Sequence, residues 1–81
     1  SGVPLYLTYS AAAAHLMYSI IKSHPFIDGN KRTAFVSGCT YLKMNGKVLP
    51  PSIQLKLSTM MIGIAANKET EKDLENFLRM L

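Results

Sequence analysis

A histidine, an acid and two adjacent cations fall within nine residues, His24-Pro25-Phe26-Ile27-Asp28-Gly29-Asn30-Lys31-Arg32. Histidine is the side chain best suited to general-base work near neutral pH. Asp28 is the only acid among the first 68 residues, and a carboxylate suits a hard cation such as Mg²⁺ that is held together with substrate phosphates. Lys31 and Arg32 add charges that can bind those phosphates. This combination indicates phosphoryl or nucleotidyl transfer.

The same stretch has the form of a loop that ends in the first turn of a helix. Backbone N–H groups there have no carbonyl partner and the helix dipole is positive, so the turn attracts anions. Gly29 lacks a side chain and allows a ligand to approach the backbone closely. A plainer interpretation makes Asp28 the cap of a helix that starts near Asn30. The cations would then be solvated, and His24 would be an ordinary residue at the end of the preceding helix. The residues by themselves leave both interpretations open.

The motif resembles the signature of the Fic/Doc superfamily, and of its Doc (death-on-curing) branch in particular. The general Fic form is similar to His-Pro-Phe-x-Asp/Glu-Gly-Asn-Gly-Arg-x-x-Arg. Here Lys31 replaces the second glycine, and Phe35 stands where the second arginine is expected. Both departures point to the Doc branch. The resemblance runs from about Tyr9 to the end of the chain, with the nine-residue motif as its most specific part.

The resemblance implies a role for each residue of the motif. His24 would be the base that takes a proton from a hydroxyl of a target protein. Asp28 would bind the Mg²⁺ carried by ATP, and Arg32 would neutralise charge on the transferred group. Phe26 would point into the core and hold the loop in place. The anion-binding site would be formed by Gly29, Asn30 and Lys31, together with Arg32.

The resemblance also implies the reaction class and the partners. Fic enzymes mostly transfer AMP from ATP to a hydroxyl side chain, whereas Doc resembles a kinase that passes the γ-phosphate to a threonine of elongation factor Tu. With Lys31 in the anion site and no arginine at Phe35, we expect phosphate transfer from a reversed ATP. AMP transfer is the first alternative. An inactive nucleotide-binding or interaction module is the second. An antitoxin that blocks the site is a further expected partner.

The spacing of apolar residues predicts an all-α fold, a small bundle of about four helices with the motif loop between the first two. Asp28-Gly29 and Asn45-Gly46 are common hairpin dipeptides, but neither lies between alternating apolar residues, so we expect no strands there. The four predicted apolar stripes are Ala13, Leu16, Met17, Ile20 and Ile21; Phe35, Val36, Cys39, Leu42 and the stem of Lys43; Ile53, Leu57, Met60, Met61 and Ile64; and Leu74, Phe77, Leu78 and Leu81.

Local signals predict where these helices begin and end. Ser10 is the expected N-cap of the first helix, and Pro25 ends that helix by disfavouring helical geometry before it. Asn45-Gly46 closes the second helix, with glycine in the left-handed conformation. The third helix begins at Pro50-Pro51-Ser52. Thr70 to Asp73 resembles a capping box with Asp in place of Glu.

Composition bounds the class of protein. Apolar residues make up 48% of the 81 residues, which excludes a disordered chain. The apolar runs are far shorter than the ~20 residues that span a bilayer, so we expect no membrane association. The net charge of +4 suits a phosphate-bearing ligand, but the basic residues are spread out and no direct nucleic-acid contact is expected. The single cysteine, Cys39, cannot form an internal disulfide, and a cytoplasmic location follows as the default.

One domain is expected over residues 1–81, with 1–8 an extended remnant and 9–81 the helical core. Family members usually have further residues before the first helix, so we expect the chain to be a piece of a longer protein. Two other reactive side chains have plainer interpretations. His15 lies beside the first stripe and is predicted to be a boundary residue. Cys39 lies on the second stripe and is predicted to be part of the core.

Overall fold

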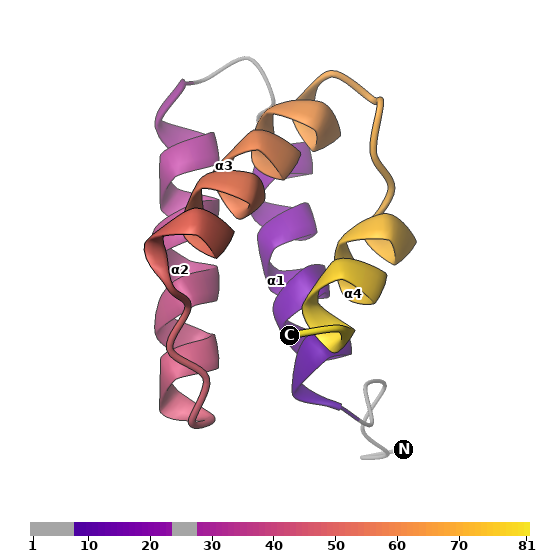
Figure 1. Ribbon diagram of the computed structural model, residues 1–81. Helices are drawn as coiled ribbons and strands as arrows, with labels where there is room; N and C mark the ends of the chain where they lie inside the picture. Colours follow the sequence, from indigo (N-terminus) through magenta and orange to yellow (C-terminus); the bar gives the residue numbers. More distant parts are fainter. Residues whose placement is uncertain (1–7, 24–27) are drawn as a thin grey trace, which may run out of the picture.

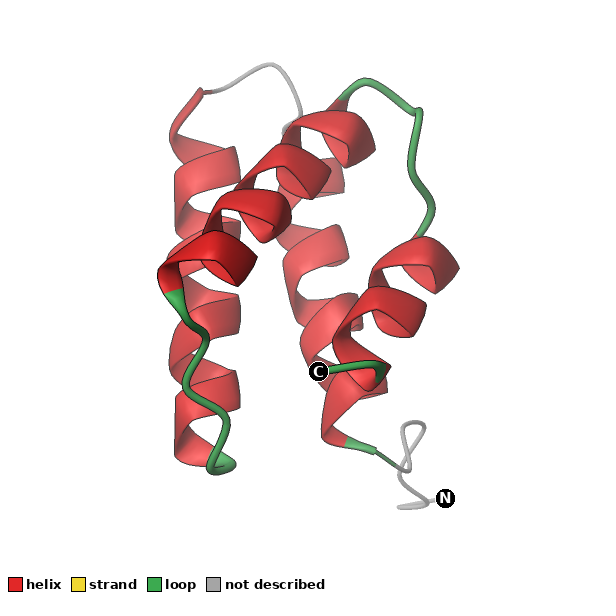
Figure 2. Cartoon of the chain, viewed as in Figure 1, coloured by secondary structure: helices red, strands yellow, loops and turns green. Residues whose placement is uncertain are grey.

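Four helices make up the computed structural model, which describes residues 8–23 and 28–81. They are α1 (Tyr9–Ser23), α2 (Asp28–Met44), α3 (Pro51–Ala65) and α4 (Glu71–Arg79), and the described residues contain no strand (Figures 1 and 2). The prediction of an all-α fold is confirmed, and so is the rejection of hairpins at the two Asx-Gly pairs. Residues 1–7 of the expected extended segment lie outside the described residues.

The start of α1 differs from the sequence prediction. Thr8, and not Ser10, caps the helix: its Oγ1 accepts a hydrogen bond from the backbone N–H of Ala11 at 3.1 Å. Ser10 lies inside the helix and is only 3% exposed. Its position lets it share one face with Ala13, Ala14 and Met17, at the i, i+3, i+4 and i+7 spacing of a buried stripe. Burial of that face therefore decides which of the two hydroxyl residues becomes the cap.

Helices α1 and α2 pack side by side and run in opposite directions (Figure 1). Their contact is close because Gly38 of α2 faces the buried side chain of Met17. A Cβ atom at Gly38 would lie 2.2 Å from the sulfur of Met17. The predicted stripe on α2 was wrong at Val36, which is 55% exposed, and at Lys43, which is also exposed. The observed buried stripe is Ala34, Gly38 and Leu42.

The predicted ends of the later helices are confirmed. Gly46 has a φ of +83°, and the N–H of Lys47 bonds the carbonyl of Leu42 at 2.8 Å, which closes α2. Pro51 begins α3. Thr70 and Asp73 form the capping box of α4, with the Thr70 N–H donating to the Asp73 carboxylate at 2.8 Å and the Asp73 N–H donating to the Thr70 hydroxyl at 3.1 Å.

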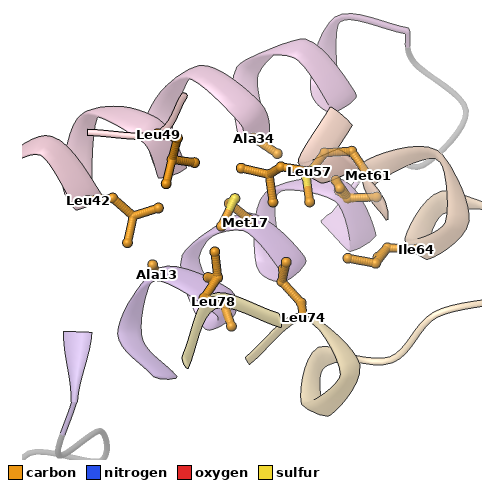
Figure 3. Packing of buried hydrophobic residues seen from close by; sticks show 12 residues of the cluster. Ala13, Met17, Ala34, Leu42, Leu49, Leu57, Met61, Ile64, Leu74 and Leu78 are labelled. Carbon is orange, nitrogen blue, oxygen red and sulfur yellow. The ribbon is translucent and has the colours of Figure 1, made fainter. Parts of the chain in front are cut away.

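The core is centred on α1, which packs against all three other helices. Met17 lies between side chains of α2, α3 and α4 (Figure 3). The predicted stripes of α3 and α4 are confirmed, with some members fully and others partly buried. The buried residues that they contribute are Leu57, Met61, Ile64, Leu74 and Leu78.

Candidate functional site

The end of α1, the start of α2 and the end of α3 lie at one end of the bundle (Figure 1). The motif connects α1 to α2 at this end. His24 and Phe26 lie outside the described residues, as does the side chain of Asp28, whose backbone begins α2. The roles that the sequence assigns to these three residues stay predictions. Gly29, Asn30, Lys31 and Arg32 follow in the first turns of α2.

Asn30 joins the two helices that flank the motif. Its side-chain amide donates a hydrogen bond to the carbonyl oxygen of Ile20, in the last turn of α1, at 3.2 Å. The Ser23 hydroxyl donates to the same oxygen at 2.7 Å. Carbonyls in the last turn of a helix have no intrahelical partner, so these two side chains satisfy one of them. The Asn30 side chain therefore ties the start of α2 to the last turn of α1, and its expected part in the anion site stays a prediction.

Gly29 is exposed and lies in the first turn of α2. A Cβ atom at this position would meet no atom of the described chain within 4 Å. Packing among the described residues therefore does not require glycine here, unlike at Gly38. No described atom occupies the space that a side chain would take at Gly29, which is consistent with the expected approach of a ligand to the backbone.

Lys31 and Arg32 line a pocket between α2 and α3. The pocket has a volume of about 300 Å³, and its other lining residues are Phe35 from α2 and Ser58, Met61 and Ile62 from α3. Sequence reasoning identified the two cations and singled out Phe35 as a departure from the family pattern. It missed the contribution of α3, which had no signal beyond its apolar stripe.

A second contact at this end of the bundle was also missed. The Lys22 ammonium donates to the side-chain oxygen of Asn67 in the α3–α4 loop, and it lies 5.6 Å from the centre of the Tyr18 ring. Asn67 has a φ of 60°, a left-handed conformation that asparagine tolerates better than most residues. The loop after α3 is therefore attached to the last turns of α1, just before the motif.

The plainer interpretations of His15 and Cys39 are confirmed. His15 is exposed and lies at the boundary between α1 and α4, with its Nδ1 3.3 Å from a carboxylate oxygen of Glu71 and its Nε2 3.3 Å from the Ser19 hydroxyl. Cys39 is half-buried against the core, and burial raises the pKa of its thiol, which disfavours the nucleophilic thiolate.

The described residues hold no group of three His, Cys, Asp or Glu side chains that could bind a metal ion. Within the same part of the chain, none of the helices combines the length and the apolar character that crossing a bilayer requires.

Comparison with known proteins bears on the motif directly. The model of the Fic/DOC family matches residues 3–42, which include α1, the whole motif and α2 as far as Leu42. A curated relative, the protein named Toxin Doc of Mycolicibacterium smegmatis (strain ATCC 700084 / mc(2)155), is 31% identical over 72 residues, or 89% of this chain. The chain belongs to the Fic/DOC family.

The motif that the sequence singled out lies within the part of the chain that matches the Fic/DOC family. The match extends beyond the nine motif residues into both flanking helices, in agreement with the resemblance stated from the sequence. The chain spans about half the length of the curated relative, 55% of it. No solved structure matches the chain.

Proposed function

We propose that the protein uses ATP and Mg²⁺ to transfer a phosphate to a hydroxyl side chain of a target protein. The observation that carries the proposal is the position of Lys31 and Arg32. Both motif cations line one pocket and lie at the N-terminal end of α2. A helix N-terminus with two adjacent cations suits the phosphates of a nucleotide, and the family of the chain supports transfer chemistry at this motif.

In this proposal the residues mainly position the reactants and stabilise charge. His24 accepts the proton of the attacking hydroxyl, whose oxygen bonds to phosphorus while the bond to the leaving ADP breaks. Arg32 stabilises the negative charge on the transferred group. The first-turn N–H groups of α2 and Lys31 hold the phosphate chain.

Asp28 would hold the Mg²⁺. It begins α2 and is followed within the next turn by Lys31 and Arg32. A single carboxylate beside two cations suits Mg²⁺ that arrives with phosphate oxygens and water as its other ligands. The bound ion would neutralise charge on the phosphates and orient them.

The pocket lining supports phosphate rather than AMP as the transferred group. In the general Fic pattern the position of Phe35 carries a second arginine, which would hold the far end of the phosphate chain. Phe35 instead lines the pocket with Lys31 and Arg32, and a phenyl ring cannot bind an anion through charge. A reversed ATP, with its γ-phosphate at the first turn of α2, depends less on that missing arginine. AMP transfer is the alternative if the nucleotide binds the other way round.

The partners follow from the proposed reaction. ATP is the co-substrate and a hydroxyl-bearing protein is the acceptor, with elongation factor Tu as the first candidate by family resemblance. The name of the curated relative, Toxin Doc, adds the proposal that an antitoxin covers the site, and we expect the protein to act in the cytoplasm.

Mass spectrometry of elongation factor Tu, incubated with the protein, ATP and Mg²⁺, tests the proposal. We expect one added phosphate, and His15→Ala should give the same product because His15 lies outside the pocket lining. One added AMP would establish the alternative transfer. If elongation factor Tu stayed unmodified, and no protein of a whole bacterial lysate was modified either, the result would support an inactive nucleotide-binding or interaction module.

A further inference from the structure

The last turn of α1 is attached to two other elements. The Asn30 side chain of α2 donates a hydrogen bond to the Ile20 carbonyl at 3.2 Å. The Lys22 ammonium donates to the side-chain oxygen of Asn67, which lies in the α3–α4 loop, 45 residues further along the chain. This loop lies at the same end of the bundle as the motif (Figure 1). Both contacts therefore hold the turn from which the chain enters the motif.

The Lys22 side chain has two neutral partners. Besides its hydrogen bond to Asn67, its ammonium lies 5.6 Å from the centre of the Tyr18 ring, one turn earlier on α1. This distance is within the range of a cation–π contact. Lys22 is also partly buried. A lysine with two partners is more restricted than a solvated one, so its contact with the loop can fix the position of the helix end.

Asn67 has the backbone conformation that a helix end usually gives to glycine. It is the only non-glycine residue with a positive φ among the described residues, at 60°, and it follows Ala66, the C-cap of α3. The N–H of Lys68 donates to the carbonyl of Gly63 at 2.8 Å, which closes the turn. Glycine would suit this backbone better than asparagine. The side-chain oxygen that binds Lys22 is what asparagine adds.

We propose that Lys22 and Asn67 are positioning residues for the transfer reaction. Their contact holds the last turn of α1, and His24 follows Lys22 by two residues. The inference rests on the proposed function, in which His24 is the base. Helix ends fray. α1 ends at Ser23, and Pro25 disfavours a further helical residue, so a contact with another element has its largest effect in this turn.

The proposed role predicts an effect on the chemical step and not on nucleotide binding. A shift of about 1 Å in a reacting group can lower a rate by about 10². Loss of the contact between Lys22 and Asn67 loosens the end of α1 but leaves the cations of α2 in place. The rate of transfer should therefore fall while the affinity for ATP stays the same.

Asn67→Gly tests the inference without disturbing the fold, because glycine adopts the left-handed conformation more easily and only the side chain is lost. With saturating ATP and target, we expect the rate of target modification to fall about tenfold. Calorimetric affinity for ATP with Mg²⁺ and the KM for the target should stay the same, and the free energy of unfolding should not fall. Asn67→Asp keeps an acceptor oxygen and tolerates the same backbone conformation, so it should keep the rate.

Lys22→Met removes the other partner and should lower the rate to a similar extent. Lys22→Met combined with Asn67→Gly should be no slower than the slower single variant, because each change removes the same contact. Lys68→Met is the matched control. Lys68 is an exposed lysine of the same loop and contributes its backbone N–H to the turn, so its substitution should leave the rate unchanged.

Equal rates for Asn67→Gly and the unchanged protein would overturn the positioning role and leave the proposed function standing. So would an Asn67→Asp protein as slow as Asn67→Gly. A lower affinity for ATP in Lys22→Met would make Lys22 a nucleotide-binding residue, and the inference would be wrong. If the unchanged protein modified no target, the proposed function would fail and the positioning role with it.

Discussion

His24 precedes the only acid of the first 68 residues by four positions, and the proposed reaction depends on it as the base. His24→Ala should lower the rate of transfer by about 10² to 10⁴, the usual range for loss of a general base, while ATP affinity stays the same. The rate of target modification and calorimetric ATP binding measure the two effects. His15→Ala, the control at the other histidine, should change neither. Full activity in His24→Ala would exclude His24 as the base.

Asp28 gives a second test at the scale of single residues. One carboxylate followed by two cations is a poor Mg²⁺ site by itself, because Mg²⁺ needs further oxygen ligands. We expect calorimetry to detect little binding of Mg²⁺ alone and clear binding of Mg²⁺ with ATP. Asp28→Asn, which keeps the size of the side chain and removes its charge, should weaken the binding of Mg²⁺ with ATP. Tight binding of the metal without nucleotide would contradict the assignment.

At the scale of elements, the contact between α1 and α2 depends on Gly38. Ala in place of Gly normally favours a helix by roughly 0.5–1 kcal/mol. At Gly38 the added Cβ would lie within 3 Å of three atoms of Met17, which is fully buried and surrounded by the core. Overpacking of this kind costs typically ~1–3 kcal/mol. We therefore expect Gly38→Ala to lower the free energy of unfolding, measured by chemical denaturation.

Gly63 offers a matched control for Gly38, since it also lies within a helix and is also covered by a side chain. The nearest atom to a Cβ there is Cγ of Glu69, at 2.7 Å. Glu69 lies in the loop before α4, where its backbone N–H bonds the carbonyl of Gly63 at 3.2 Å. Its side chain is only partly buried and can rotate about the Cα–Cβ bond to relieve the contact. Gly63→Ala should therefore be neutral or slightly stabilising. Equal losses of stability at the two glycines would show that the contact with Met17 is not the cause.

The capping box of α4 makes stability depend on pH. Hydrogen bonds from the backbone N–H of Thr70, and then from its side chain, lower the pKa of the Asp73 carboxyl from its ordinary value of 3.8. A carboxyl whose pKa is lower in the folded state stabilises the fold above the unfolded-state pKa, and this contribution is lost as the pH falls through the folded-state pKa. The melting temperature should therefore fall as the pH drops below the ordinary pKa of 3.8. Asp73→Asn should make the melting temperature depend less steeply on pH in this range. If the melting temperature of Asp73→Asn fell with pH as steeply as that of the unchanged protein, the acid sensitivity would belong to other carboxyls.

The helices were predictable because their signals are local. The capping box at Thr70 and the left-handed Gly46 depend on residues within one turn, and both are confirmed. The faces of α1 and α2 were less predictable. Ser10 has the residue type of a cap, but burial of its face places it inside the helix. Val36 is apolar and yet exposed. Close packing at Gly38 turns the face of α2 that carries Gly38 toward α1, and Val36 lies on another face of the helix.

At the scale of the whole molecule, the two sides of the pocket come from segments about 25 residues apart in the sequence. Residue chemistry and family resemblance selected Lys31 and Arg32, since their motif is contiguous. Ser58, Met61 and Ile62 join them only because of the way α3 crosses α2. An apolar stripe predicts that a face is buried but does not predict its partner. The site could therefore be predicted on α2 and not on α3.

The last prediction concerns which part of ATP reaches the target. With γ-labelled and α-labelled ATP offered separately, the unchanged protein should transfer only the γ label. Lys31→Gly combined with Phe35→Arg restores the general Fic pattern and should raise transfer of the α label. One charge-assisted contact contributes about 1.5–3 kcal/mol, which corresponds to roughly one to two decades in rate. The double variant should therefore transfer a measurable amount of the α label and still transfer some of the γ label. Transfer of the α label by the unchanged protein would overturn the phosphate proposal in favour of AMP. A double variant that still transfers only the γ label would show that these two positions do not set the orientation of the nucleotide.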